Sequence, residues 1–374
     1  MRIVSIVGTR PQLIKAAALE PILRARASAT LIDTGQHWDH ALAGTFFAEL
    51  GLPRPEHTLG IGGGGHGAQA GRMLEALEPL LLASTPDAVV VYGDTNSTLA
   101  GAVAAAKLGL PVAHVEAGLR SFDRAMPEEV NRVVADHVSR WCFAPTATAV
   151  ANLAREGITE GVVLVGDLMQ DLAARILPEI RDPAILGTTG LTSSGGGPPA
   201  PGRYLYATIH RAQNRSGAAM RAWAAILDAA ATPDRPVLLA LHPGTQAALA
   251  EAGIRLADTV RVVPPVGYRT SLALQLHAAA VITDSGGIQR EASWLGTPCL
   301  ILRDTTEWPE VVQGAASTTV VVGLDASKAA AALRRLAPPG DGSAVTARVA
   351  AARIEPTGAG AAIVDVLLGR GATA

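Results

Sequence analysis

Residues Gly93 to Asp136 read GDTNSTLAGAVAAAKLGLPVAHVEAGLRSFDRAMPEEVNRVVAD, and this stretch decides the fold. One apolar run, residues 88–93, leads into it, and a second lies at residues 111–115. The helical pattern between them, from about Ser97 to Leu108, predicts a strand–helix–strand crossover. Such strands lie parallel in one sheet, so their carboxyl ends open on the same edge, where α/β proteins place their ligand crevice.

This edge of the predicted sheet gathers carboxylates. Asp94 ends the first apolar run and Glu116 ends the second, while Glu128 lies on the first turn of the next helix, just after Pro127. Proline suits that helical position. Carboxylates that share a crevice can divide acid and base roles, because mutual repulsion separates their pKa values. The stretch therefore predicts a site of proton transfer.

Each carboxylate also has a structural alternative. Asp94 could cap the helix that follows it, and Glu128 could complement the positive end of its helix dipole. Glu116 is harder to explain in this way. It lies between Val115 and an Ala-Gly pair, where a buried carboxylate is costly unless it is paired or used.

The composition limits the class of protein. A chain of 374 residues is typical of two α/β domains, and 49% hydrophobic but 3% aromatic residues predict a core of Ala, Val and Leu. A net charge of −2 argues against a nucleic-acid partner. Cys142 and Cys299 form no CxxC pair, which argues against a disulfide framework or a zinc site and fits a reducing compartment.

Neither a signal peptide nor a membrane span is expected. The first predicted strand, residues 2–7, runs into Gly8-Thr-Arg-Pro too early for a signal peptide. No apolar run reaches the roughly 18 residues that a membrane span needs. We therefore expect a cytoplasmic protein with no membrane partner.

Residues 183–202 have linker composition, with consecutive glycines and prolines among serines and threonines and no apolar period. They separate a first α/β domain, residues 1–182, from a second, residues 203–355. A final helix, within about residues 356–374, is expected to cross back onto the first domain.

Two loops of the first domain carry candidate ligand contacts. Arg10 lies in a turn between a strand and a helix N-terminus, a geometry that favours an anion, and Lys15 follows one helical turn later. Solvated surface charges are the alternative for both. Gln36 and His37 lie in the loop after the second strand, where substrate contact or ordinary loop chemistry is expected. The histidines and aspartate of that loop lack the spacing of a metal site.

The second domain presents polar residues at predicted strand ends. His210 and Arg211 follow the end of one predicted strand, and His242 follows the end of another, residues 237–241. Histidines in such places suit anion binding or proton traffic, although each alone is more often an ordinary loop residue.

The segment Asp284–Glu291 has the sequence pattern that most strongly predicts phosphate binding in this chain. Gly286 and Gly287 allow close backbone approach, a helix N-terminus supplies free N–H groups, and Ser285 adds a hydroxyl. Glu291 lies six residues beyond Ser285, about 9 Å along a helix, roughly the span from a pyrophosphate to a ribose. Asp284 itself is expected to cap the helix.

Several blocks in this order resemble the non-hydrolysing UDP-N-acetylglucosamine 2-epimerase family over nearly the whole chain. They are Gly8-Thr-Arg-Pro, Gly35-Gln-His, Gly93-Asp-Thr-Asn-Ser-Thr, His114-Val-Glu-Ala-Gly-Leu-Arg, Pro127-Glu-Glu-Val-Asn-Arg, His210-Arg-Ala, Asp284-Ser-Gly-Gly-Ile-Gln and Arg303-Asp-Thr-Thr-Glu.

The resemblance implies a GT-B architecture, in which two Rossmann-like domains hold the sugar nucleotide in the cleft between them, usually as a homodimer, with no nicotinamide or metal. It also implies a reaction. UDP leaves C1 as a proton is removed from C2, giving a 2-acetamidoglucal, and UDP then adds back as a proton reaches the other face. Two faces require two acid/base groups or one well-placed water, which fits a carboxylate cluster.

Matched residue by residue, the resemblance also implies roles. Asp94, Glu116 and Glu128 form the acid/base set, and His210 assists the departing diphosphate. Arg10 and Lys15 hold the phosphates or the sugar. The other substrate-binding residues are Ser285, Gly286 and Gly287 for the diphosphate, Glu291 for the ribose, and Gln36, His37, Arg211 and His242.

Some positions depart from the commonest family pattern. Gln12 and Gln213 stand where Glu is common, and Trp308 stands where Arg is usual, so a basic residue near the nucleotide is missing. Gln12, Ile209–Ala212 and Glu307-Trp308 instead resemble the branch that acts on UDP-2,3-diacetamido-2,3-dideoxyglucuronate. That branch also inverts C2. The reaction is thus the same on either substrate, of which UDP-N-acetylglucosamine is the one we expect.

Other classes remain open at this point. A GT-B glycosyltransferase would need an acceptor surface and a single base, and a hydrolysing epimerase would release UDP. A sugar-nucleotide sensor is least expected, because all three carboxylates are present.

Overall fold

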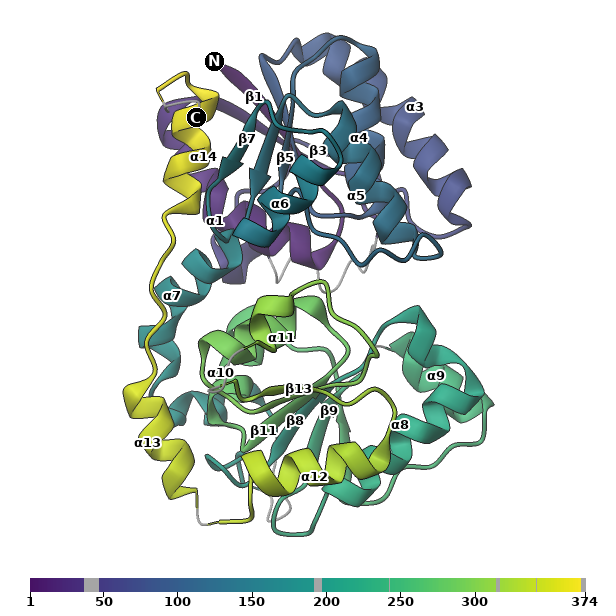
Figure 1. Cartoon of the computed structure of the whole chain (residues 1–374), viewed down its shortest axis with the longest axis vertical. Coiled ribbons are helices and arrows are strands. Elements are labelled where there is room, and N and C mark those ends of the chain that lie inside the picture. Colours follow the sequence, from purple (N-terminus) through teal and green to yellow (C-terminus); the bar gives the residue numbers. More distant parts are fainter. Residues whose placement is uncertain (37–46, 192–196, 242, 314–316, 341, 371–374) are drawn as a thin grey trace. The chain divides into compact units, whose positions relative to one another are not determined.

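The computed structural model describes residues 1–36, 47–191, 197–241, 243–313, 317–340 and 342–370 (Figure 1). The chain divides into two compact units, Met1–Leu172 with Glu355–Ala374, and Ala173–Ile354. Each is built on one parallel sheet, so the α/β class with two Rossmann-like domains is confirmed. The sequence placed the boundaries at residues 182 and 355.

The first unit contains a seven-stranded sheet in the order β3-β2-β1-β4-β5-β6-β7, with parallel pairing throughout. Its strands are β1 (Arg2–Val7), β2 (Ser28–Asp33), β3 (His57–Thr58), β4 (Ala88–Tyr92), β5 (Val112–Val115), β6 (Trp141–Ala144) and β7 (Val162–Leu164). The predicted crossover corresponds to β4, α4 (Asn96–Lys107) and β5.

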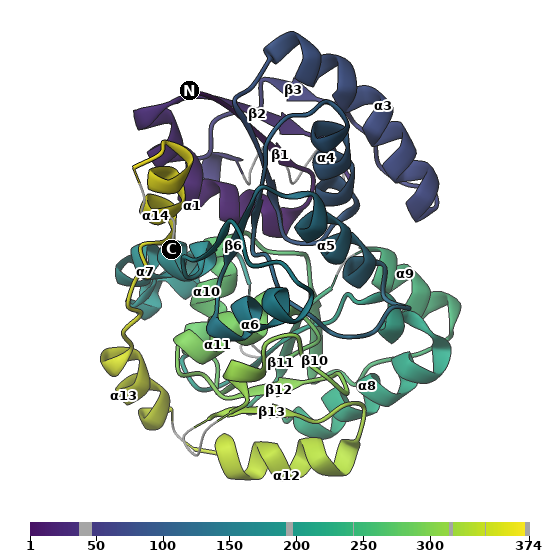
Figure 2. The same ribbon diagram turned by 45° about the horizontal axis from the view of Figure 1, so that its top comes forward.

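Helices cover this sheet, and one of them comes from the C-terminal segment of the chain. They are α1 (Arg10–Arg26), α3 (His66–Ser84), α4, α5 (Pro127–Val138), α6 (Ala147–Arg155), α7 (Leu168–Ile180), which runs across the unit boundary, and α14 (Ala359–Leu367). Helices α3, α4 and α5 pack one beside the next (Figure 2). The yellow helix α14 packs against the purple helix α1 (Figure 1).

Small side chains let α4 lie directly on the strands. A Cβ at Gly101 would lie 2.9 Å from Ile6 Cδ1 and 3.0 Å from Val91 Cγ1. Four alanines of α4 are also buried, and the core beneath it is aliphatic, as the composition predicts. The N-terminal end of α4, which follows β4, lies at the carboxyl edge of the sheet.

The second unit contains a six-stranded parallel sheet in the order β10-β9-β8-β11-β12-β13. Its strands are β8 (Leu205–Thr208), β9 (Val237–Ala240), β10 (Val260–Val263), β11 (Ala280–Thr283), β12 (Cys299–Ile301) and β13 (Thr319–Val321). Its helices are α8 (Gly217–Ala230), α9 (Pro243–Glu251), α10 (Tyr268–His277), α11 (Gly286–Trp294), α12 (Ala326–Leu336) and α13 (Ser343–Ala351). Short 3-10 helices occupy Pro183–Thr189, Ala212–Arg215 and Pro309–Val311.

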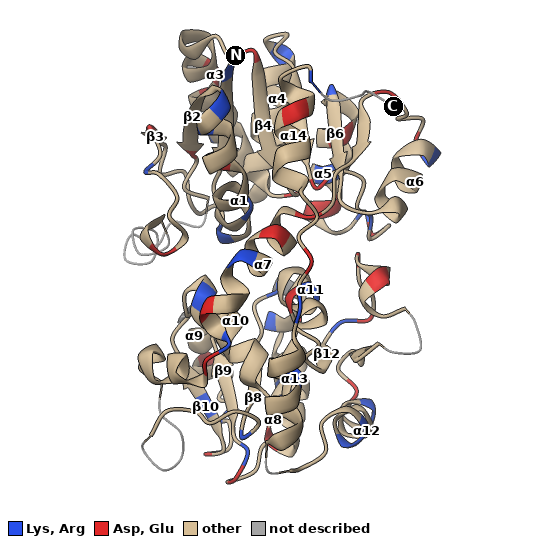
Figure 3. Cartoon of the chain, turned by 90° about the vertical axis from the view of Figure 1, so that its left-hand side faces the viewer, with Lys and Arg blue, Asp and Glu red and all other residues tan. Residues whose placement is uncertain are grey.

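Both sheets reverse their strand order once, between β1 and β4 in the first unit and between β8 and β11 in the second. Ligands of open α/β sheets bind outside the carboxyl ends of the strands at such a point. Acidic and basic residues are interspersed over the helices and loops of each unit, on a largely uncharged chain (Figure 3). The reversal of strand order in each sheet, rather than a charged surface, therefore indicates the candidate ligand site.

Candidate active site

The ends of β4 and β5 lie side by side in the first unit. The two strands pair in parallel, with Tyr92 opposite Val115. Asp94 and Glu116 therefore follow strand ends at the same edge of the sheet, as the sequence predicts.

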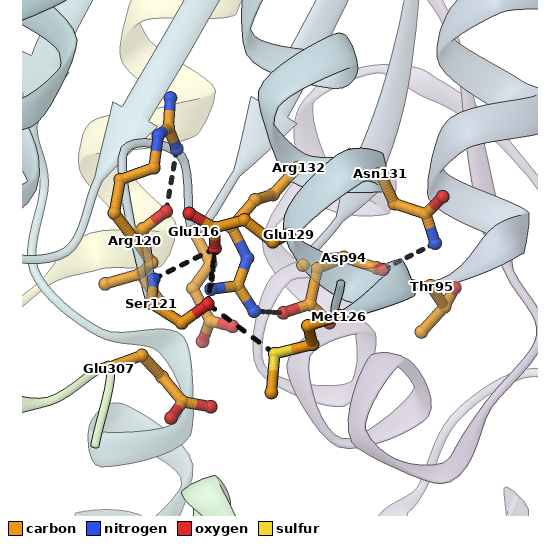
Figure 4. A network of polar contacts seen from close by, with 12 residues as sticks. Asp94, Thr95, Glu116, Arg120, Ser121, Met126, Glu129, Asn131, Arg132 and Glu307 are labelled. Atoms are coloured by element: carbon orange, nitrogen blue, oxygen red, sulfur yellow. Dashed lines mark hydrogen bonds and ion pairs between the residues drawn. The ribbon is translucent and has the colours of Figure 1, made fainter. Parts of the chain in front are cut away.

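Helix α5 holds Asp94. Arg132 Nη2 forms an ion pair with Asp94 Oδ2, and Asn131 Nδ2 donates to the Asp94 backbone oxygen at 3.0 Å (Figure 4). The Asp94 side chain is 28% exposed. Asp94 does not cap α4, because the cap is Thr95, whose side chain accepts a hydrogen bond from Thr98 N. The capping alternative is wrong, and Asp94 is a partly exposed carboxylate beside a guanidinium.

Glu116 forms a buried ion pair with α1. Lys15 Nζ donates to Glu116 Oε1 at 2.7 Å. Glu116 has a φ of 71°, a left-handed conformation that costs a non-glycine residue about 1–3 kcal/mol and that clusters at functional sites. Gly93 leaves room for the pair, since a Cβ there would lie 3.2 Å from Lys15 Nζ. Lys15, expected to hold the phosphates or the sugar, thus has Glu116 as its partner.

Two adjacent glutamates of α5 have different surroundings. Glu129 is buried and accepts hydrogen bonds from Ser121 N and Phe122 N at 2.9 Å each. It also pairs with Arg132 Nη1 at 3.0 Å. Glu128 is half-buried, and within the described part of the chain its side chain makes no hydrogen bond or ion pair. Glu129 therefore fixes the loop before α5, whereas Glu128 is not committed to a described neighbour.

Arg132 joins this loop to the carboxylate edge. One of its nitrogens contacts Asp94 and the other contacts Glu129 (Figure 4). The sequence interpretation gave Asn131 and Arg132 no role. They lie three and four residues after Glu128, a spacing that puts side chains on one face of a helix, and this spacing is the signal that could have found them.

Gln12 holds the turn between β1 and α1. Its Oε1 accepts from Thr9 N at 3.1 Å, and its Nε2 donates to Tyr92 O at 2.8 Å and to Thr98 Oγ1 at 2.9 Å. A glutamate would have no N–H for the Tyr92 carbonyl, so glutamine suits these partners. Arg10, the first residue of α1, is half-buried beside this turn.

Gln36 connects the loop after β2 to the start of α4. Its Oε1 accepts from Ser97 N at 2.9 Å and from Ser97 Oγ at 2.7 Å. Gly8 lies against the same serine, since a Cβ at Gly8 would be 2.3 Å from Ser97 Oγ. His37 and His242, the other expected contacts from these strand ends, lie outside the described residues.

In the second unit, Asp284 is a structural anchor. Its buried carboxylate accepts from His210 N and Arg211 N at 3.1 and 3.0 Å, and from Asn214 Nδ2 at 2.8 Å. The cap of α11 is Ser285, so the expectation that Asp284 caps this helix is wrong. Asp284 instead holds the loop after β8 against the end of β11.

The start of α11 has the geometry expected of a phosphate site. Ser285, Gly286 and Gly287 are partly exposed at its N-terminus, where backbone N–H groups lack helical partners. The His210 side chain is 51% exposed, with Nδ1 3.3 Å from Asp284 Oδ1. These groups lie at the strand-order reversal of the second sheet.

Two further expected contacts already have protein partners. Arg211 Nη2 pairs with Glu307 Oε1 at 2.9 Å, and Glu307 also pairs with Arg303 at 2.6 Å. Glu291 is buried and accepts from Gln275 Nε2 at 2.6 Å.

Trp308, which stands where the family usually has Arg, packs on another cation. The Arg290 guanidinium lies over its ring, 3.8 Å from the centroid, and 5.7 Å from the ring of Trp294. Arg290 Nε also donates to Gly286 O, at 3.4 Å. A positive charge is therefore present beside the first turn of α11 although residue 308 is not basic.

The structure also bears on metal binding and on membrane insertion. Among the residues it describes, no three His, Cys, Asp or Glu side chains are grouped to hold a metal ion. No described helix combines the length and the apolar character needed to cross a bilayer.

Known proteins are similar in sequence to this chain over most of its length. The UDP-N-acetylglucosamine 2-epimerase family profile matches residues 22–367. A UDP-N-acetylglucosamine 2-epimerase homologue of Methanococcus maripaludis is 43% identical over 318 residues, 83% of this chain and 86% of the relative. The UDP-2,3-diacetamido-2,3-dideoxy-D-glucuronate 2-epimerase of Pseudomonas aeruginosa is 41% identical over 331 residues, 87% of this chain and 90% of that protein.

A solved structure extends the likeness to the fold. The Methanocaldococcus jannaschii UDP-GlcNAc 2-epimerase, crystallised with UDP-GlcNAc and UDP, matches with a TM-score of 0.85 at 35% identity, over 99% of this chain and 100% of that one. The similarities confirm the GT-B class and the resemblance seen in the sequence. The chain belongs to the UDP-N-acetylglucosamine 2-epimerase family.

Proposed function

We propose that the protein is an isomerase that inverts C2 of a UDP-sugar without net hydrolysis, converting UDP-N-acetylglucosamine to UDP-N-acetylmannosamine. The observation that carries this proposal is the carboxylate edge of the first unit. Asp94 and Glu116 follow adjacent strand ends, and each is paired with a cation. Glu128 lies on the helix that supplies the partner of Asp94.

The proposed chemistry is an elimination followed by an addition. A carboxylate takes the proton from C2, the C–H electrons form a C1=C2 double bond, and UDP leaves C1 with the electrons of the C1–O bond. A UDP oxygen then attacks C1 while a second group delivers a proton to the opposite face of C2. Asp94, Glu116 and Glu128 form the acid/base set, and Lys15 and Arg132 balance the charge of two of them.

The second unit supplies the proposed nucleotide contacts. Ser285, Gly286 and Gly287 offer backbone N–H groups and a hydroxyl to the diphosphate. His210 assists as the diphosphate departs, and Glu291 binds the ribose. Arg10, Gln36, His37, Arg211 and His242 complete the proposed substrate-binding set.

Proton NMR in deuterium oxide tests the reaction directly. With UDP-N-acetylglucosamine and no acceptor, we expect deuterium at C2 and growth of UDP-N-acetylmannosamine, with only a trace of free UDP. Accumulation of UDP and a free sugar would instead indicate a hydrolysing enzyme. Product that forms only with an added acceptor would indicate a glycosyltransferase.

UDP-2,3-diacetamido-2,3-dideoxyglucuronate is the second candidate substrate. Gln12 and Trp308 favour it, because they match that branch and have specific partners in this structure. The Pseudomonas aeruginosa relative named for that substrate is 41% identical. Comparing kcat/KM for the two UDP-sugars decides between them.

The assembly and the compartment are part of the same proposal. By its resemblance to the family, we expect a homodimer in the cytoplasm. Light scattering on the purified protein and fractionation of the host cell check these two expectations.

A further inference from the structure

His114 is a buried histidine of β5 whose two ring nitrogens both face hydrogen-bond acceptors. Nδ1 lies 2.6 Å from Asp136 Oδ1, and Nε2 lies 2.6 Å from Gly93 O. A carbonyl oxygen has no proton to donate, and a neutral imidazole carries only one N–H. If Asp136 is ionised, both contacts are hydrogen bonds only when both nitrogens carry a proton.

The surroundings of Asp136 favour its ionised form. Its Oδ2 accepts from Arg120 Nη1 at 2.7 Å and from Gly118 N at 3.1 Å. Burial acts to raise the pKa of Asp136, but His114 and Arg120 together outweigh it, so the pKa lies below its ordinary value. Arg120 also pairs with Glu156 at 2.7 Å. The contacts thus run from the buried imidazole to a buried carboxylate, a buried guanidinium and a partly exposed second carboxylate.

This chain of contacts touches every segment that carries a proposed catalytic carboxylate. Gly93 immediately precedes Asp94, and His114 lies two residues before Glu116. Asp136 belongs to α5, the helix that carries Glu128. One ring therefore bridges the end of β4, the end of β5 and α5.

The bridge acts where the backbone leaves the strand conformation. Gly93 has a φ of 62° and Glu116 a φ of 71°, so neither turn is held by ordinary strand geometry. The hydrogen bond from His114 to the Gly93 carbonyl joins these two turns directly. Gly93 N also donates to Val115 O at 2.9 Å, and Asp94 itself contacts Arg132 and Asn131.

We propose that His114 carries a proton on both ring nitrogens and that it acts with Asp136 as a positioning pair for the catalytic carboxylates. Neither residue touches the substrate. The proposal rests on the assignment of Asp94, Glu116 and Glu128 as the acid/base set. A displacement of about 1 Å at such groups costs roughly 10²-fold in rate, so the pair is expected to affect kcat far more than substrate binding.

The first experiment reads the protonation of His114 in the unmodified protein. Two-dimensional ¹H–¹⁵N NMR tuned to histidine rings is expected to show two slowly exchanging N–H protons on His114, assigned by their loss in His114→Gln. A single ring N–H on His114 would overturn the proposal. This result does not depend on activity, so it stands apart from the proposed reaction.

The second experiment measures kcat and KM for UDP-N-acetylglucosamine in Asp136→Asn, His114→Gln and the double variant. Each single variant is expected to lose roughly 10- to 100-fold in kcat, with KM within about threefold. The double variant is expected to lose little more than either single one, because the two residues act as one unit.

His277→Gln is the matched control. His277 is also buried and contacts a backbone oxygen, Ile180 O, at 2.9 Å, but it belongs to the second unit and touches none of the carboxylate segments. Its kcat is expected to equal that of the unmodified enzyme. Folded Asp136→Asn with an unchanged kcat, or losses that multiply in the double variant, would refute the positioning role. An unmodified enzyme that exchanges no C2 proton would refute the proposed reaction instead.

Discussion

The two sheets place an aspartate at the same topological position and surround it differently. Asp94 follows β4 and Asp284 follows β11, each on the strand just beyond the reversal of strand order. Asp94 is 28% exposed and pairs with Arg132, whereas the Asp284 side chain is fully buried and accepts from two backbone N–H groups and Asn214.

This difference separates the proposed reacting group, Asp94, from a structural anchor, Asp284. Neutral donors on three sides use the lone pairs of Asp284, so its carboxylate can hold a loop but has no face left for a ligand. Arg132 beside Asp94 balances its charge, and part of the Asp94 side chain remains exposed. Position in the sheet topology therefore identifies the candidate residues. The number and kind of their partners then distinguish a candidate reacting group from a structural anchor.

The largest expected effect comes from exchanging each aspartate for asparagine. Asp94→Asn is expected to lower kcat by about 10²–10⁴-fold, the range for loss of an acid/base group, with little change in unfolding. Asp284→Asn is expected to lower the free energy of unfolding by about 1–3 kcal/mol, because its new amide would face backbone donors. Kinetics and urea unfolding of both variants check this pair. A folded Asp284→Asn that loses kcat as severely as Asp94→Asn would break the comparison.

The adjacent glutamates of α5 repeat the comparison within one helix. Glu128→Gln is expected to lower kcat by about 10²-fold at unchanged stability, since Glu128 has no described partner. Glu129→Gln is expected to lower the free energy of unfolding by about 1–3 kcal/mol, because it weakens the contacts to Ser121, Phe122 and Arg132. The same two measurements apply. Equal kcat losses at equal stability would show that the glutamates are not divided in this way.

The smallest expected effect concerns the two cysteines, whose thiols are expected to be unreactive in the native state. Burial raises the pKa of Cys142 and of Cys299 to about 12, so at pH 8 only about one thiol in ten thousand is ionised. Neither is expected to react with Ellman's reagent in the native state.

The two thiols can also report on each unit separately, since Cys142 lies in β6 and Cys299 in β12. Alkylation at rising urea concentration, read by mass spectrometry, is expected to expose Cys299 earlier in Asp284→Asn and Cys142 earlier in Glu129→Gln. If both thiols respond to both variants, the two units unfold as one.

The sequence predicts the elements around the site well, because buried strands such as β4 and β11 are short apolar runs that end at glycine or aspartate. The sequence did not identify several helices, among them α3, α7, α10 and α12. Pro79 and Pro178 weaken the local helical signal of α3 and α7, whereas α10 and α12 contain no proline. Local pattern alone therefore underestimates the helical content of both units.

The partners of the carboxylates could not be predicted in the same way. Lys15 and Glu116 are 101 residues apart in the sequence, so only the folded sheet brings them together. The strand-end rule locates Glu116 but not the lysine that neutralises it. Gln12 is the reverse case. The sequence identifies it as a departure from the family pattern, and the structure explains it by the hydrogen bond that its side chain donates to Tyr92 O.

The return of α14 to α1 sets an order of events during synthesis. Arg26 Nη2 pairs with Asp365 Oδ1 at 2.6 Å, and Asp171 accepts from Thr357 N, so the first unit is completed by residues beyond 354. A ribosome releases those residues only after the whole second unit has emerged. The second unit can therefore fold as a continuous nascent segment, while the unit that carries Asp94 must wait for the residues beyond 354. A nascent chain stalled before residue 355 then has a complete second unit tethered to an unfinished first one.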